Sequence, residues 1–294
     1  LMQVWASICM GEPHEIYMKV WNALLFVSMV GLLFCALRRK TGPMTALVAA
    51  FFLASVPLLT YHALTAYADL PLGFYALGGL ICFRDVVDRR ENGSPADLRG
   101  MLVLTGTSVA MCAWTKMDGL FFVAAFSASL MLYFLMKRMP LLRSIAYVVP
   151  PALVLVTWYA FLLFVGVPVN YGEVSQMGEA VAEGIHIQVI PVIAEQILFS
   201  ANFNIVFPAL FLMMVLGYRS IVRSDLAFLY GVVLAVMVLF LVLYLGTETY
   251  RWVMNLTAVN RNILTFLPMM YYVAALTAHR LLQGDAGPNN RSER

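Results

Sequence analysis

The sequence predicts an all-α protein, a polytopic bundle of transmembrane helices, on three observations. Of the 294 residues, 62% are hydrophobic and only 12% are charged, whereas a soluble domain normally carries about 25% charged residues. The mean hydropathy is +0.83. The charged residues gather in short clusters between continuous apolar runs, whereas a membrane β-barrel alternates polar and apolar residues. The net charge of +3 does not indicate a nucleic-acid partner.

About nine apolar runs are predicted to span the membrane. The first ends at three consecutive cations, and the second starts at Pro43, as helices often do. The third and fourth, about 14 to 15 residues each, are short for a hydrocarbon core of about 30 Å. The fifth ends at Lys137, the sixth contains Pro150 and Pro151 and is expected to kink or begin late, and the last contains Pro268. In chain order the predicted spans are 17–37, 43–60, 70–83, 100–114, 120–136, 141–165, 197–216, 226–245 and 263–278.

The predicted spans form one transmembrane domain, residues 1–280, with a longer outer segment at 166–196 and a disordered cytoplasmic tail at 281–294. Fifteen of the 19 Lys and Arg residues fall on one side of this bundle. The positive-inside rule assigns that side to the cytoplasm, so the N-terminus is expected outside and the C-terminus inside. The expected location is a bacterial inner (plasma) membrane. The cations left on the outer side are Lys19, Lys116, Arg251 and Arg261.

A short polar stretch between the second and third spans, YHALTAYADLP, carries the first candidate for chemistry. Asp69 stands immediately before a Leu-Pro pair that is typical of a helix start. Its carboxylate can cap that helix, or it can be a catalytic group. Tyr61, His62 and Tyr67 precede it and are suited to stacking on a sugar and to hydrogen bonding. Their presence favours a substrate-binding loop with Asp69 as its catalytic residue.

The other candidates lie at the outer ends of later spans. Lys116 can pair with Asp118 as an ordinary surface lysine, or the two can belong to a substrate site in which Lys116 contacts a lipid-linked phosphate. Arg261 lies about one turn before the last apolar run, either as an interfacial anchor or as a guanidinium directed into the site. Arg251 stands between Tyr and Trp, which favours an anchor, although it is also a candidate for substrate binding. Glu248 can pair with Arg251 or coordinate a metal.

The evidence for a metal is weaker than that for an anion site. Asp69 and Glu248 are the candidate ligands for a divalent cation such as Mg²⁺ or Mn²⁺. In the outer segment, Glu179, Glu183 and His186 fall at i, i+4 and i+7, which places them on one face of a helix. Because two glycines weaken a helix there, a solvated acidic face at the membrane surface is the better interpretation.

Three stretches, AYADLPLGFYALGGL at 66–80, TKMDGLFFVAAF at 115–126 and VNRNILTFLPMMYYVA at 259–274, resemble bacterial polyprenyl-phosphate-dependent glycosyltransferases. These enzymes have the GT-C fold and are protein-mannosyltransferase-like, or family-39-like. The resemblance implies an enzyme that moves a sugar from a polyprenyl-phosphate donor to a lipid, glycan or protein acceptor on the outer face. It also implies lipid-phosphate contacts for Lys116 and Arg261.

In that family an essential acidic residue lies in the first outer loop, and this chain has no position that matches it. Asp69 corresponds to the second acidic position of the family. The chain starts at Leu1 without a signal peptide, which is expected if an earlier span has been cut away. The resemblance therefore implies an N-terminally truncated chain that can lack its catalytic base.

The expected reaction is an inverting displacement at the anomeric carbon. A carboxylate activates the acceptor hydroxyl, directly or through a divalent cation, and Lys116 and Arg261 stabilise the departing phosphate. The prenyl chain is expected in a groove between spans that Met269 and Met270 can line, unless these are plain core residues. Two alternatives stay open, a secondary transporter or flippase and a non-catalytic membrane subunit. The predicted spans carry few charges in their interiors, which argues against transport.

Overall fold

The computed structural model describes residues 8, 11, 15–65, 67–92, 95–138, 144–165, 185–199, 201–203, 205–256 and 258–283. Of these residues 87% are helical and none is in a strand, which confirms the all-α prediction. Residues 166–184 of the predicted outer segment and 284–294 of the predicted tail lie outside the described ranges.

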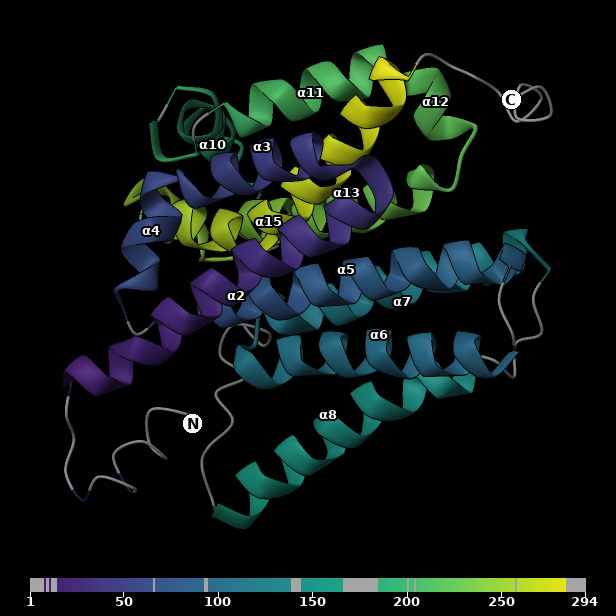
Figure 1. Cartoon of the computed structure of the whole chain (residues 1–294). Helices are drawn as coiled ribbons and strands as arrows, with labels where there is room; N and C mark the ends of the chain where they lie inside the picture. Colours follow the sequence, from purple (N-terminus) through teal and green to yellow (C-terminus); the bar gives the residue numbers. More distant parts are fainter. Residues whose placement is uncertain are drawn as a thin grey trace, which may run out of the picture.

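Helices of very different length make up the described chain (Figure 1). In chain order they are α2 (Glu15–Thr41), α3 (Pro43–Ala54), α4 (Pro57–Ala63), α5 (Asp69–Asn92), α6 (Pro95–Thr115), α7 (Gly119–Met136), α8 (Ile145–Val165), α10 (Val189–Leu198), the 3₁₀ turn η2 (Ala201–Phe203), α11 (Val206–Leu216), α12 (Tyr218–Val222), α13 (Leu226–Gly246), α14 (Tyr250–Met254) and α15 (Ala258–Leu282).

Several of these helices are long and apolar enough to cross a membrane, which indicates a membrane protein. The five that qualify alone lie within α2, α5, α7, α8 and α13, and α3 with α4 would make a sixth, broken by a 71° bend. The bend follows from Pro57, which cannot donate a backbone hydrogen bond and disfavours a helical residue before it. The nine predicted spans are not confirmed beyond these five or six.

Two predicted boundaries are wrong. The apolar run 197–216 is divided, because α10 ends at Leu198 and α11 begins at Val206. The polar SANFN sequence interrupts the run, and the 11 residues of α11 reach only about 17 Å. The charged residues 84–92 continue α5 instead of forming a loop. Asp88 lies one turn after Arg84 and pairs with it at 2.7 Å, an arrangement that stabilises a helix.

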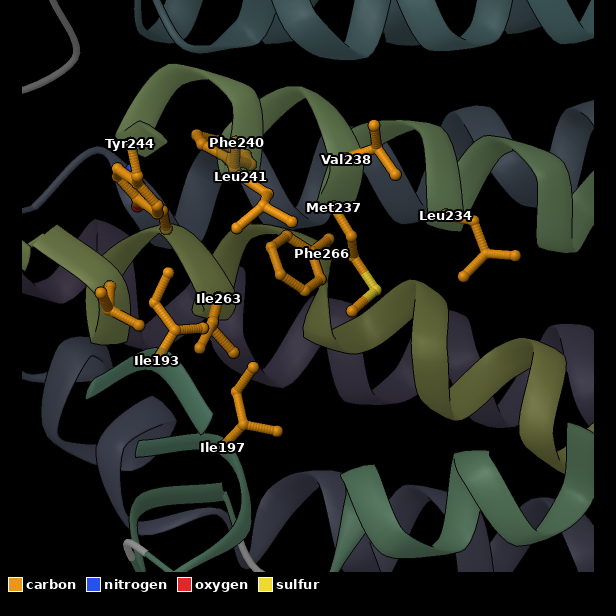
Figure 2. Close-up of a pocket in the computed structure, with 12 residues that line it drawn as sticks. Ile193, Ile197, Leu234, Met237, Val238, Phe240, Leu241, Tyr244, Ile263 and Phe266 are labelled. Carbon is orange, nitrogen blue, oxygen red and sulfur yellow. The ribbon is translucent and has the colours of Figure 1, made fainter. Parts of the chain in front are cut away.

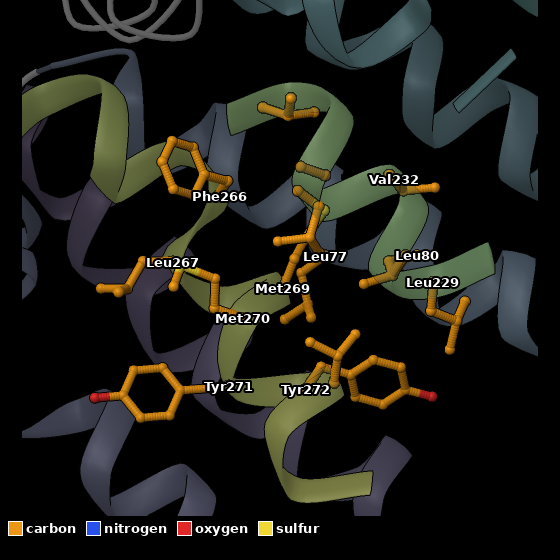
Figure 3. Packing of buried hydrophobic residues seen from close by; sticks show 14 of the residues in the cluster. Leu77, Leu80, Leu229, Val232, Phe266, Leu267, Met269, Met270, Tyr271 and Tyr272 are labelled. Carbon is orange, nitrogen blue, oxygen red and sulfur yellow. The ribbon is translucent and has the colours of Figure 1, made fainter. Parts of the chain in front are cut away.

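Helix α15 lies at the centre of the bundle and packs against α2, α3, α5 and α13 (Figure 1). Figure 3 shows its side chains interlocking with those of α5 and α13. Met269 and Met270 are fully buried in this core, so the prediction that they line a lipid groove is wrong and the core interpretation is correct. The buried hydroxyl of Thr277 contacts Tyr230 at 2.9 Å and the Val273 carbonyl at 2.9 Å. An inner helix can therefore be less apolar than one that faces lipid.

Candidate functional site

Three of the predicted residues converge at the start of α5. Asp69 is fully buried, and both of its carboxylate oxygens accept hydrogen bonds from cations. Lys116, at the end of α6, donates from Nζ to Oδ1 at 3.0 Å. Arg261, in the first turn of α15, donates from Nε to Oδ2 at 2.9 Å. The carboxylate is therefore the hub of an ion cluster and not merely a helix cap.

Lys116 extends the cluster in two further directions. Its Nζ lies 2.5 Å from Oδ2 of Asp118 and donates to Oδ1 of Asn262 at 3.4 Å. The Asn262 amide in turn donates to the Tyr244 hydroxyl at 2.7 Å. Lys116 thus makes both the predicted pair with Asp118 and a link from Asp69 to α13. Asp69, Lys116, Asp118 and Arg261 together form the ion cluster.

The aromatic residues of the polar stretch border the ion cluster. Tyr67 lies under the Arg261 guanidinium, 4.6 Å from ring centroid to Cζ, a distance suited to a cation–π interaction. The buried His62 lies 5.2 Å from the Tyr67 ring, centroid to centroid, and its Nδ1 is 3.8 Å from Oδ2 of Asp69. Tyr61 packs its edge against His62 and is otherwise exposed.

Local sequence features hold these groups in place. The Asn22 amide of α2 donates to the backbone carbonyls of Thr65 and Tyr67, which fixes the loop before Asp69. Between α6 and α7, the Gly119 amide donates to the Lys116 carbonyl at 2.9 Å. A Cβ on Gly119 would lie 2.0 Å from the Cys112 carbonyl oxygen, so only glycine fits this tight connection.

Gly73 sets the distance between α5 and α15. A Cβ there would lie 3.3 Å from the carbonyl oxygens of both Leu264 and Thr265. Gly73 is one turn after Asp69, and these two carbonyls are about one turn after Arg261. The close approach of the two backbones therefore brings the Asp69 carboxylate within reach of the Arg261 guanidinium.

The charges of the ion cluster balance, since two cations face two carboxylates. Exposure is uneven: the Asp69 side chain is 0% exposed, that of Lys116 26% and that of Arg261 40%. The bond to Asp69 uses Nε of Arg261, so the two terminal nitrogens are left for another acceptor. The arrangement holds two partly exposed cations on one buried carboxylate.

An almost wholly apolar cavity of about 250 Å³ lies between α10, α13 and α15 (Figure 2). Two of its lining residues, Tyr244 and Asn262, are hydrogen-bonded to each other, and Asn262 also contacts Lys116 of the ion cluster. Its volume is a little below the range typical of small-ligand sites. The other lining residues are Ile193, Ile197, Leu234, Met237, Val238, Phe240, Leu241, Val259, Ile263 and Phe266.

Arg251 and Glu248 do not join the ion cluster. Their ion pair is 3.6 Å long, and their side chains are exposed. Arg251 also lies 5.9 Å from the Tyr250 ring centroid, as expected of an interfacial anchor. Within the described ranges neither residue contacts Asp69 or Lys116.

The described ranges contain no group of three or more His, Cys, Asp or Glu side chains arranged to hold a metal ion. The divalent cation stays a prediction. Of the spaced acidic set, Glu179 and Glu183 lie outside the described residues. His186 is buried and stacks on Tyr250 at 3.8 Å between ring centroids.

Sequence reasoning missed Asn22, Tyr244 and Asn262. Asn262 follows Arg261 in the NRN triplet immediately before the last predicted span, and its place beside a candidate residue was a usable signal. Tyr244 and Asn22 carried no such signal, because single polar residues in apolar runs are common.

Comparison of the chain with protein-family models, with curated proteins and with solved structures found no match. The resemblance to GT-C glycosyltransferases therefore stays with the three stretches that carry it.

Proposed function

We propose that the chain is an integral membrane glycosyltransferase of GT-C type, which takes a sugar from a polyprenyl-phosphate donor on the non-cytoplasmic face of a bacterial inner membrane. The acceptor is a lipid, a glycan or a protein. One observation carries the proposal: two partly exposed cations, Lys116 and Arg261, meet a buried carboxylate, and Lys116 contacts Asn262, which lines an apolar cavity. A prenyl phosphate has this composition, an apolar chain that ends in an anion.

In the proposed complex the cavity holds the first part of the prenyl chain, and Asn262 marks its polar end. The phosphate then lies against Lys116 and the terminal nitrogens of Arg261. Arginine and lysine both favour phosphate oxygens as partners. Tyr67, which stacks on Arg261, and the exposed Tyr61 offer aromatic faces to a sugar.

Asp69 has a double role in the proposed reaction. In the absence of donor both oxygens accept hydrogen bonds from cations, so neither is free to accept a hydrogen bond from an acceptor hydroxyl. A bound phosphate competes for the same cations and frees one Asp69 oxygen. That oxygen takes the proton of the acceptor hydroxyl while the hydroxyl oxygen bonds to the anomeric carbon and the bond to the phosphate breaks. The electron pair of that bond leaves with the prenyl phosphate, which the cations stabilise.

The test is transfer of radiolabelled sugar from a panel of polyprenyl-phosphate sugars to membrane acceptors, by the protein in lipid nanodiscs. Release of polyprenyl phosphate is expected from wild type and from Arg251→Gln, whose charge lies outside the ion cluster. We expect at least a hundredfold slower release from Arg261→Gln, because oxyanion partners contribute about 10²–10³ in rate. Equal rates in the two arginine variants would remove the ion cluster from the reaction.

One observation favours a second candidate, a non-catalytic membrane subunit. Both Asp69 oxygens are already paired, as in a purely structural ion cluster. This candidate predicts no sugar release from any donor and no binding preference for a prenyl phosphate over the corresponding alcohol.

A further inference from the structure

A second group of charged residues lies far from Asp69 along the same helices. Arg84 is fifteen residues after Asp69 on α5, about 22 Å along the helix axis. Arg280 is nineteen residues after Arg261 on α15, about 28 Å along that axis. This second group of charged residues is separate from the ion cluster, and its role does not depend on the function proposed above.

The carboxylates near Arg84 are already paired. Asp88 receives Nη2 of Arg84 on one oxygen at 2.7 Å and Nζ of Lys40 on the other at 2.5 Å. Lys40 also lies 3.2 Å from Asp85. Lys40 of α2 thus pairs with both Asp85 and Asp88 of α5, and Arg84 shares Asp88.

Arg84 has more donors than the described residues can satisfy. Its side chain is only 14% exposed, and its Nε and Nη1 atoms are buried without a hydrogen-bond partner among the described residues. A guanidinium cannot lose its proton in a protein. Burying its N–H groups without an acceptor is costly, so the geometry requires an acceptor at this position.

Arg280, near the end of α15, is a second cation in this region. This partly buried residue interacts electrostatically with Arg84, Asp88 and Asp225. Asp225 is paired with Lys137 at 2.9 Å, and no salt bridge of Arg280 occurs in the described part of the chain.

We propose that Arg84 and Arg280 bind the phosphate of an anionic ligand at this end of the bundle. Two guanidinium groups from different helices can share one phosphate through paired N–H···O bonds, which suits phosphate geometry. The ligand is a phospholipid headgroup or a soluble phosphate. The bound ligand would link α5 to α15 and so stabilise the end of the bundle opposite the ion cluster.

The test is thermal unfolding of the delipidated protein in a neutral detergent, titrated with phosphatidylglycerol, with phosphatidylcholine or with inorganic phosphate. Wild type is expected to gain Tm with phosphatidylglycerol at a lower concentration than with phosphatidylcholine. Arg84→Gln and Arg280→Gln should each raise the half-maximal concentration about tenfold or more. The matched control is Arg223→Gln, an exposed cation of the same residue type, which should respond like wild type.

A response to phosphatidylglycerol alone assigns a lipid, and a response to inorganic phosphate assigns a soluble ligand; both support the site. If Arg84→Gln does not fold, Arg280→Gln carries the comparison. Equal responses in Arg280→Gln and Arg223→Gln would overturn the proposal. It is overturned too if the Tm of wild type responds to none of the three probes.

Discussion

Replacing Asp69 by Asn removes the charge that holds the ion cluster together while keeping the size of the side chain. The variant leaves the cations of Lys116 and Arg261 without their common carboxylate. Removing one partner of a buried ion pair costs about 3–5 kcal/mol. Because the two cations are 26% and 40% exposed, water offsets part of this loss, and we expect about 2–4 kcal/mol of the free energy of unfolding.

The assay is reversible unfolding in mixed micelles, followed by circular dichroism across an SDS titration. Asp118→Asn is the matched control, because Asp118 contacts only Lys116 among the cluster cations and is partly exposed. It should cost less than about 1 kcal/mol. In an Arg261→Gln background, Asp69→Asn should cost at least about 1 kcal/mol less than in wild type, since the two residues share a contact. An Asp69→Asn variant as stable as Asp118→Asn would refute the reasoning.

Three further predictions test the parts around the ion cluster. A Cβ added in Gly78→Ala meets only ordinary contacts, so this variant should raise the free energy of unfolding by up to about 1 kcal/mol. Gly73→Ala should leave the free energy of unfolding unchanged or lower it in the same SDS titration. Equal gains in the two variants would contradict the close approach of α5 to α15. Tyr244→Phe removes the acceptor of the Asn262 amide and should cost about 1 kcal/mol in that assay, so a neutral result would mean that this bond is not formed. Val238 lies at an exposed edge of the cavity. Val238→Trp should weaken binding of a long prenyl phosphate about tenfold or more in a radioligand assay and leave binding of inorganic phosphate unchanged. If the variant binds the long prenyl phosphate as tightly as wild type does, the cavity does not hold the prenyl chain.

The sequence was sufficient to predict the helical class and the candidate residues Asp69, Lys116 and Arg261. Charged residues are scarce in this chain, and those at the ends of apolar runs are costly to place in a membrane unless they pair. Their convergence could be expected for that reason. Tyr244 and Asn22 could not be identified, because nothing in an apolar run shows which side a single polar residue faces.

Helix ends were predicted less well, for identifiable physical reasons. Hydropathy located the end of α5 at the first charges, but Arg84 and Lys40 both pair with Asp88, and the helix continues past them. Hydropathy also favoured one span over residues 197–216, although a short polar sequence divides it. α15 is not among the helices that are long and apolar enough to cross a membrane. It is nevertheless the central helix, because its polar groups form hydrogen bonds inside the protein.

The most direct measurement is the ratio of two dissociation constants, for a polyprenyl phosphate and for the polyprenol of the same length, determined for the protein in nanodiscs. The proposed site predicts that wild type and Arg251→Gln bind the phosphate at least about tenfold more tightly than the alcohol, and that Arg261→Gln loses this preference. If wild type binds both lipids equally, or if Arg261→Gln keeps the full preference, the ion cluster does not bind a lipid-linked phosphate.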